Sequence, residues 1–158
     1  IFSRDWPQVH DGAYAAVRLR DDLAAATGEP IELLKVSAVP WAVVPPWMSA
    51  KIAQGHPPIY VADGAFPFRT AAGELCLLIS SWSATGYTTG VARSLSGELR
   101  GPWRADATPL FDADGGHAML FDGFDGGRYL TLHQPNDPPP EHPRFFRCTE
   151  TAGRLQLA

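Results

Sequence analysis

Short runs of apolar residues, or of alternating apolar and polar residues, recur along this chain, and Gly, Asp and Pro residues separate them. Alternation with a period of two is typical of half-buried β-strands. The pattern predicts strands at Ala13 to Leu19, Glu74 to Ser83, Tyr87 to Ser94, His117 to Phe121, Arg128 to His133 and Arg144 to Thr149. A single stretch, Asp21 to Gly28, is compatible with a helix, and Gly28 limits it to a turn or two. We therefore expect an all-β fold.

Two connections between the predicted strands are long and rich in proline. They run from Pro40 to Pro58 and from Pro135 to Pro143. Because proline interrupts regular structure, both are expected to be irregular. Long loops on a rigid β scaffold commonly carry binding surfaces.

An internal repeat organises the chain. Asp-Gly pairs at residues 11, 63 and 122 each lead into a strand that carries an aromatic residue, and the period is about 50 to 60 residues. A unit of this length with about four strands matches one blade of a β-propeller, and propellers typically close with four to eight blades. We therefore predict a partial β-propeller of about three four-stranded blades, at about residues 1–58, 59–114 and 115–158. Missing N-terminal blades or another chain would complete the ring.

The composition agrees with a folded domain and excludes some partners. Of 158 residues, 45% are hydrophobic and 11% are aromatic, which suffices for a packed core. The 17 Asp and Glu residues outnumber the 13 Lys and Arg residues, and a net charge of -4 offers no basic surface for a nucleic acid or an anionic membrane. We therefore expect no nucleic-acid and no membrane partner. Cys76 and Cys148 lack metal-binding neighbours in the sequence, so they are predicted to be unpaired thiols in different blades.

Three polar residues interrupt apolar strand beginnings at nearly equal intervals. Asp5, Asp63 and His117 are separated by 58 and 54 residues. Because the innermost strands of successive blades face a shared axis, this spacing predicts that the three side chains converge on one central pocket. Hydrolysis of a glycosidic bond needs two carboxyl groups, one to protonate the leaving oxygen and one to activate water. The alternative is that Asp63 forms a turn, Asp5 is a strand-edge acid and His117 is a satisfied core histidine.

Further side chains are candidates for contacts with a substrate. Trp6, Phe66 and Trp82 are candidate platforms for sugar rings, and Arg69 and His117 are candidate polar contacts. Aromatic rings present flat apolar faces on which sugars stack. For any one of these aromatic residues, packing in the core is the alternative.

Motifs that carry a family resemblance follow one another over nearly all of the chain. They are Arg4-Asp5-Trp6, Asp63-Gly64-Ala65-Phe66-Pro67-Phe68-Arg69, Ile79 to Trp82, Gly86 to Ser94, Ser96 to Trp103, Gly115 to Phe121, and Leu132 to Asn136 with Glu141-His142-Pro143. In order and spacing they resemble the C-terminal three blades of glycoside hydrolase family 43, in members that carry a His-Glu-Trp motif. That family consists of five-bladed β-propellers that act on arabinose- and xylose-containing glycans.

The resemblance implies a function for the complete protein. This would be an inverting, arabinofuranosidase- or xylosidase-like hydrolase of oligosaccharides or polysaccharides of plant type, with a base, an acid and a third carboxylate that adjusts the pKa of the acid. The base would lie in the first blade, outside this sequence, so residues 1–158 alone are expected to be inactive. Asp5 and Asp63 would take the acid and pKa-modulating roles, in an order that the sequence leaves open. No cofactor is required, but His117 matches a central histidine that contacts a metal ion or its water shell, such as a structural calcium ion on the axis.

The sequence also departs from the family pattern. Arg4 and Asp5 stand where the motif has His and Glu, and Ala65 stands where the family has Pro. Asp is shorter than Glu by about 1.5 Å, and a positive neighbour lowers the pKa of a carboxyl group, which suits an ionised modulator better than a proton donor. A non-catalytic glycan-binding or interaction propeller of the same fold is therefore the alternative function. An unrelated β-sandwich is the alternative fold.

Overall fold

The computed structural model describes residues 1–5 and 9–158, and it consists of three antiparallel sheets. The first sheet contains β1 (Phe2–Arg4), β2 (Ala13–Leu19) and β3 (Ala26–Lys35). The second contains β4 (Asp63–Arg69), β5 (Leu75–Ser83), β6 (Gly86–Ser94) and β7 (Trp103–Ala105). The third contains β8 (Gly116–Asp122), β9 (Arg128–Gln134), β10 (His142–Thr151) and β11 (Arg154–Leu157). The prediction of an all-β partial propeller is confirmed, with three strands in the first described sheet and four in each of the others.

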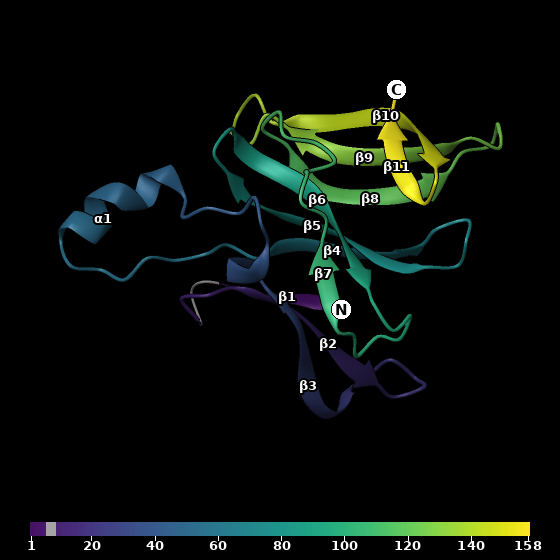
Figure 1. The fold of residues 1–158 in the computed structure, drawn as a ribbon, viewed down its shortest axis with the longest axis horizontal. Coiled ribbons are helices and arrows are strands. Elements are labelled where there is room, and N and C mark those ends of the chain that lie inside the picture. Colours follow the sequence, from purple (N-terminus) through teal and green to yellow (C-terminus); the bar gives the residue numbers. More distant parts are fainter. Residues whose placement is uncertain (6–8) are drawn as a thin grey trace.

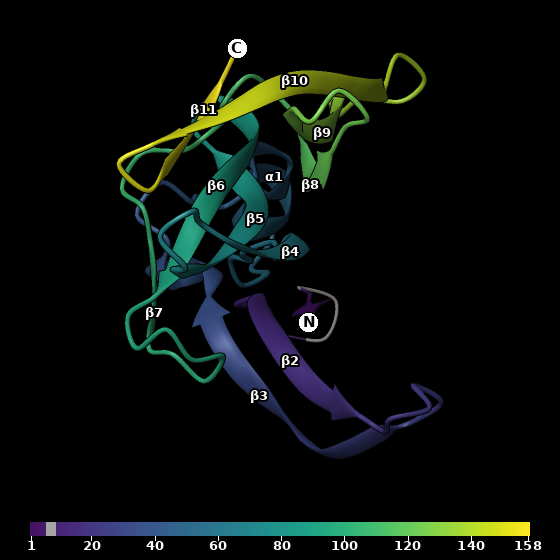
Figure 2. The same cartoon turned by 90° about the vertical axis from the view of Figure 1, so that its right-hand side faces the viewer.

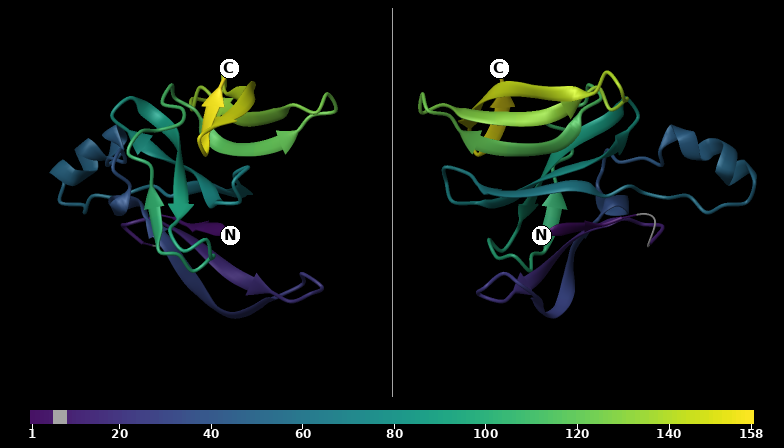
Figure 3. Two further views of the ribbon diagram at one scale, coloured as in Figure 1. Left: turned by 45° about the vertical axis from the view of Figure 1, so that its right-hand side comes forward. Right: turned by 180° about the vertical axis from the view of Figure 1, so that it is seen from behind.

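The three sheets lie beside one another in chain order. Figure 1 shows the second sheet between the first sheet, below it, and the third sheet, above it. The β2–β3 hairpin extends away from the other two sheets (Figure 2), and the same succession is seen from two further directions in Figure 3. Strand β4 contacts both β1 and β8. The first strands of the three sheets therefore meet in one region, as the inner strands of propeller blades do.

Strand β5 shows how the sheets are held together. Leu77 and Ile79 pack in a core with residues of β2 and β3, whereas Cys76 and Leu78 pack in a second core with residues of β8 and β9. All four side chains are fully buried. Because successive side chains of a strand point to opposite faces, a continuous apolar run fits a strand that is buried on both faces. The second sheet therefore contributes one face to each of two cores.

The sequence prediction for Asp21 to Gly28 is wrong. This stretch forms no helix; it makes a turn, and strand β3 begins at Ala26. The hairpin partner β2 overrides the weak helical preference, because β3 gains a ladder of hydrogen bonds along an edge of the first sheet. Pro30 lies where the pairing of β3 with β2 shifts register, between Ile31 and Thr27, and a proline is tolerated at such an irregularity of an edge strand.

The connection Pro40 to Pro58 is less irregular than expected. It is preceded by a single 3-10 turn at Val36–Ala38 and contains another at Pro46–Met48, which continues into the short helix α1 (Ser49–Ala53). The helix projects away from the sheets on the left of Figure 1. None of its residues is buried, so it adds little to the core.

The two cysteines are placed as the sequence predicts. Cys76 lies in β5 and Cys148 in β10, and both are buried and unpaired. Burial raises the pKa of the Cys76 thiol to about 11, against the opposing charge of Arg93. Over residues 1–5 and 9–158, no helix is both long and apolar enough to span a membrane.

Candidate active site

Asp63 lies at the start of β4, where the first strands of the sheets meet. Both oxygens of its carboxylate are held by the protein. The hydroxyl of Tyr87 donates to Oδ2 at 2.8 Å, and Nε2 of His117 lies 2.6 Å from Oδ1. The backbone N–H of Gly64 also donates to Oδ1, at 3.1 Å. Since Tyr87 belongs to β6 and His117 to β8, this carboxylate links the second sheet to the third.

Glycine allows the backbones around Asp63 to approach one another. Gly64 has a φ of +48°, and a Cβ at this position would lie 2.8 Å from the Cα of His117. A Cβ on Gly116 would collide with the ring of Tyr87. His117 itself has a φ of 52°, and its backbone N–H donates to Oγ of Ser80 at 3.0 Å. Any larger residue than glycine at these two positions would collide with a neighbour where β4 and β8 meet.

The partners of Asp63 determine its charge. Burial raises the pKa of Asp63, but the hydrogen bonds from His117 and Tyr87 outweigh burial, so its pKa lies below the ordinary value. The same bond to Asp63 raises the pKa of His117, although burial opposes this. Burial and then the charge of Asp63 raise the pKa of Tyr87, so its phenol stays protonated and donates. The site therefore favours an Asp63 carboxylate facing a His117 imidazolium.

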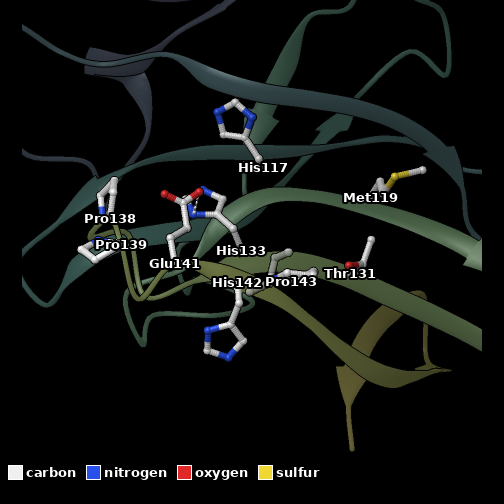
Figure 4. Close-up of a pocket in the computed structure, with 10 residues that line it drawn as sticks. His117, Met119, Thr131, His133, Pro138, Pro139, Glu141, His142 and Pro143 are labelled. Carbon is white, nitrogen blue, oxygen red and sulfur yellow. Dashed lines mark ion pairs between the residues drawn. The ribbon is translucent and has the colours of Figure 1, made fainter.

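A cavity of about 400 Å³ opens beside this carboxylate. It is lined by Asp63, Tyr87, His117, His133, Asn136 and Glu141. A second cavity, of about 480 Å³, shares His117, His133 and Glu141 and extends over β9 and the loop before β10 (Figure 4). Charged and aromatic side chains together fit a sugar, because they bond its hydroxyl groups and stack on its apolar face.

Three rings form a cluster on the wall of the cavity. The ring centroid of His133 lies 5.4 Å from that of Tyr87 and 5.5 Å from that of His117. Nδ1 of His133 lies 3.0 Å from Oε1 of Glu141, and Figure 4 shows the two side chains facing each other. The cavity thus places the carboxylates of Asp63 and Glu141 at the two ends of a chain of imidazole rings.

Asp5 occupies a different position in its sheet from Asp63 and His117. It follows the last residue of β1, whereas Asp63 begins β4 and His117 is the second residue of β8. Burial and Asp63 raise the pKa of Tyr87 most, and the bond to Asp63 raises the pKa of His117 most, against burial. The charge of Asp5 makes a smaller contribution in the same direction to both. Asp5 therefore lies within electrostatic range of the two side chains that hold Asp63, although the equal spacing in sequence does not reflect equivalent strand positions.

The structure separates the other predicted substrate contacts. Trp6 lies outside the described residues. Trp82 packs edge-on against the ring of Tyr87, with centroids 6.0 Å apart, and does not line either cavity described above. Phe66 and Arg69 line a different cavity of about 150 Å³. Because a strand advances about 3.3 Å per residue, β4 carries these two side chains away from Asp63.

A calcium ion needs several oxygen ligands in one place. Over the described residues, no group of three or more His, Cys, Asp or Glu side chains is arranged to hold a metal ion. Nε2 of His117, the residue expected to contact such an ion or its water, is paired with Asp63. The calcium ion on the axis therefore stays a prediction, and no step of the proposed chemistry is derived through one.

Sequence reasoning did not select Tyr87, His133 and Glu141 as site residues, although the motifs of the family resemblance contain all three. An aromatic residue in an alternating strand is typical of the core, and this obscured the role of Tyr87. Strand register carried a usable signal for His133, because it pairs with Gly116 across β8 and β9, next to His117. For Glu141, a usable signal was its position in the Pro-rich loop that follows β9, because long loops commonly carry binding surfaces.

Three sheets whose first strands converge on a fixed carboxylate define a segment of a β-propeller with a charged central pocket. No protein-family model and no curated protein matches this sequence. Among solved structures, the chain is similar to an endo-arabinase from Bacteroides thetaiotaomicron, with 33% identity and a TM-score of 0.82 over 96% of this chain and 51% of that one. It also resembles a thermostable family-43 glycoside hydrolase, with 16% identity and a TM-score of 0.72 over 98% of this chain and 51% of that one.

A third structure with the same fold is an α-L-arabinofuranosidase from Lactobacillus brevis, with 20% identity and a TM-score of 0.66 over 95% of this chain and 48% of that one. The chain therefore spans about half the length of the solved structures that it matches. Its fold is that of a propeller segment like the one in the family-43 glycoside hydrolase, which agrees with the resemblance of its motifs. The likeness to the His-Glu-Trp subgroup stays a prediction.

Proposed function

We propose that this chain supplies part of the catalytic pocket of an inverting, arabinofuranosidase- or xylosidase-like glycoside hydrolase. The observation that carries the proposal is Asp63, a carboxylate held by two sheets on the wall of a cavity with charged and aromatic sides. The 33% identity to an endo-arabinase over 96% of this chain supports the same class of chemistry. Arabinose- or xylose-containing glycans of plant type would be the substrates.

The charge of Asp63 supports a division of roles between the two aspartates. A group whose pKa is lowered is a poor proton donor but a good acceptor of hydrogen bonds from sugar hydroxyls. Asp63 would then orient the sugar and hold up the pKa of a nearby acid by charge repulsion. Proton donation would fall to Asp5, although its positive neighbour Arg4 favours the ionised form, and a carboxylate from another part of the protein would activate water on the opposite face of the sugar.

A non-catalytic glycan-binding propeller is the second candidate. It is favoured by the observation that both oxygens of Asp63 already accept hydrogen bonds from the protein, which suits a fixed acceptor for sugar hydroxyls. The two candidates differ in one respect. Binding alone needs no ionisable partner on the opposite face of the sugar, whereas hydrolysis does.

The test is hydrolysis of aryl arabinofuranosides and aryl xylosides by the full-length protein and by its Asp63→Asn and Asp5→Asn variants. The amide keeps the shape of the carboxylate but removes its ionisation, so kcat is expected to fall about 100-fold or more in each variant while KM changes little. Residues 1–158 alone are expected to cleave neither substrate. If both variants keep kcat within about twofold of an active parent, the catalytic roles are wrong. An inactive parent that binds arabino- or xylo-oligosaccharides would support the binding propeller.

A further inference from the structure

Glu141 is a carboxylate of the cavity to which the proposed chemistry gives no role. It lies in the loop of residues 135–141 between β9 and β10, which lines the cavity with Asn136 and Glu141. Its side chain is 37% exposed, and its Oε1 atom lies 3.0 Å from Nδ1 of His133. The contact therefore ties a loop residue to a residue of the sheet.

His133 contacts both side chains that hold Asp63. Its ring packs at 39° against Tyr87 and at 68° against His117, the two side chains that pair with the oxygens of Asp63. Nδ1 of His133 is buried from solvent, and in this geometry it is at ion-pair distance from Glu141 without an aligned hydrogen bond. A buried ring nitrogen needs a polar partner, because an unsatisfied one costs about 1–3 kcal/mol. The carboxylate of Glu141 is the partner that the structure offers.

A second hydrogen-bonded contact fixes the same loop to the site. Oδ2 of Asp114 accepts from the backbone N–H of Asn136, at 3.1 Å, and its Oδ1 accepts from the backbone N–H of Tyr87, at 3.2 Å. One carboxylate thus joins the beginning of the loop to the strand that carries the Tyr87 hydroxyl. With the loop fastened in this way, Glu141 is held at a defined distance from the ring cluster rather than at the end of a free segment.

We propose that Glu141 is a positioning residue that acts through His133. It fixes the His133 ring against Tyr87 and His117, and these two side chains then hold the Asp63 carboxylate in its orientation toward the cavity. Glu141 itself would not exchange a proton with the substrate. The proposal concerns the arrangement of the site, and its effect on turnover rests on the proposed glycosidase function. It requires that Nδ1 of His133 carry a proton, facing Glu141.

The first measurement does not depend on activity. Nitrogen-15 NMR of the histidine rings in the full-length protein is expected to show a protonated Nδ1 on His133, and Glu141→Gln is expected to change the His133 signals. Asp137→Asn is the matched control, because Asp137 is exposed in the same loop and its substitution also removes one negative charge. A wild-type His133 with an unprotonated Nδ1 would overturn the proposal, whether or not the protein is a glycosidase.

The second measurement is a double-mutant cycle on turnover. Glu141→Gln is expected to lower kcat about tenfold with KM within about twofold, since misplacing a catalytic group affects the reaction more than binding. Glu141→Asp, which keeps the charge, should recover most of kcat, and Asp137→Asn should leave it unchanged. His133→Phe keeps an aromatic ring but removes both nitrogens. In this background, adding Glu141→Gln should lower kcat by less than a further factor of two. A full tenfold loss in that background would show that Glu141 acts without His133, and the proposal would be wrong.

Discussion

Gly64 and His117 approach each other so closely that a Cβ on Gly64 would lie 2.8 Å from the Cα of His117. Both residues have positive φ angles, of 48° and 52°. The crossing of β4 and β8 is therefore made possible by one missing side chain, and it brings Nε2 of His117 to the carboxylate of Asp63.

Replacing Gly64 with alanine should consequently damage both stability and the site. Gly126 is the control, because it also has a positive φ, of 73°, but has open space around it. Gly126→Ala should cost only the strain of the left-handed conformation, about 1–2 kcal/mol. Gly64→Ala should cost about 1–3 kcal/mol more, since the backbone of His117 must also move. Chemical denaturation of the full-length variants measures both, and equal losses would show that the crossing is not tightly packed.

The hydroxyl of Tyr87 should help to keep Asp63 ionised. Tyr87→Phe removes one of the hydrogen bonds that lower the pKa of Asp63, so the acidic limb of the pH–kcat/KM profile should move to higher pH. Tyr129→Phe removes a bond of the same length, 2.8 Å, from an exposed carboxylate, Asp125, and should leave the profile in place. An unshifted limb in Tyr87→Phe would mean that Tyr87 does not control the charge of Asp63.

The pair of His117 and Asp63 should make stability depend on pH in a defined direction. The pKa of His117 is raised above 6.5 by its bond to Asp63, so the stabilisation is complete below pH 6.5 and is lost as the pH rises through the folded-state pKa. The pKa of Asp63 is lowered, so its contribution is present above 3.8 and is lost as the pH falls through the folded-state pKa.

Denaturation of wild-type and His117→Gln proteins between pH 5 and pH 9 checks this dependence. The difference in the free energy of unfolding should be nearly constant up to about pH 6.5 and should shrink at higher pH. His56→Gln, at an exposed position on the connection after α1, serves as the control and should show no such trend. A difference that grows with pH would contradict the assignment of the proton to His117.

Arg93 should be the most costly cation to replace. Its Nε and Nη2 donate to both oxygens of Asp106, at 2.9 and 3.0 Å, while Nη1 donates to the carbonyl of Gly153 in the third sheet. Lysine cannot reproduce this planar arrangement, so Arg93→Lys should lower the free energy of unfolding by about 2–4 kcal/mol. Arg128→Lys changes an exposed pair with Asp122 and should cost at most about 1 kcal/mol. Similar losses in the two variants would contradict an inter-sheet role for Arg93.

Much of the fold could be predicted because the strong signals are local. Ala13 to Leu19 is predicted with its observed bounds, and the apolar run around Leu77 is found because burial on both faces leaves a continuous hydrophobic segment. Strand β3 could not be found in the same way. Most of its residues are exposed and it contains glycine and proline, so only its pairing with β2 defines it.

The site was predictable in part for a similar reason. Asp63 and His117 interrupt apolar strand beginnings, so they can be recognised in the sequence. Tyr87 and His133 belong to the site because of strand register and contacts between rings on neighbouring strands, which the sequence does not show directly. Phe66 and Arg69 follow Asp63 on the same strand. A strand separates such neighbours along its length, and the sequence does not show how far each lies from the cavity beside Asp63.

The burial of β5 on both faces has a consequence for how the molecule opens. Leu77 and Leu78 are neighbours in sequence but belong to different cores, so β5 cannot leave its place without opening both cores. Amide protons in the middle of β5 should accordingly exchange with solvent only through global unfolding. The site takes Asp63, Ser80 and Tyr87 from this same sheet. The site is thus built on the sheet whose central strand should be the last to lose its backbone hydrogen bonds.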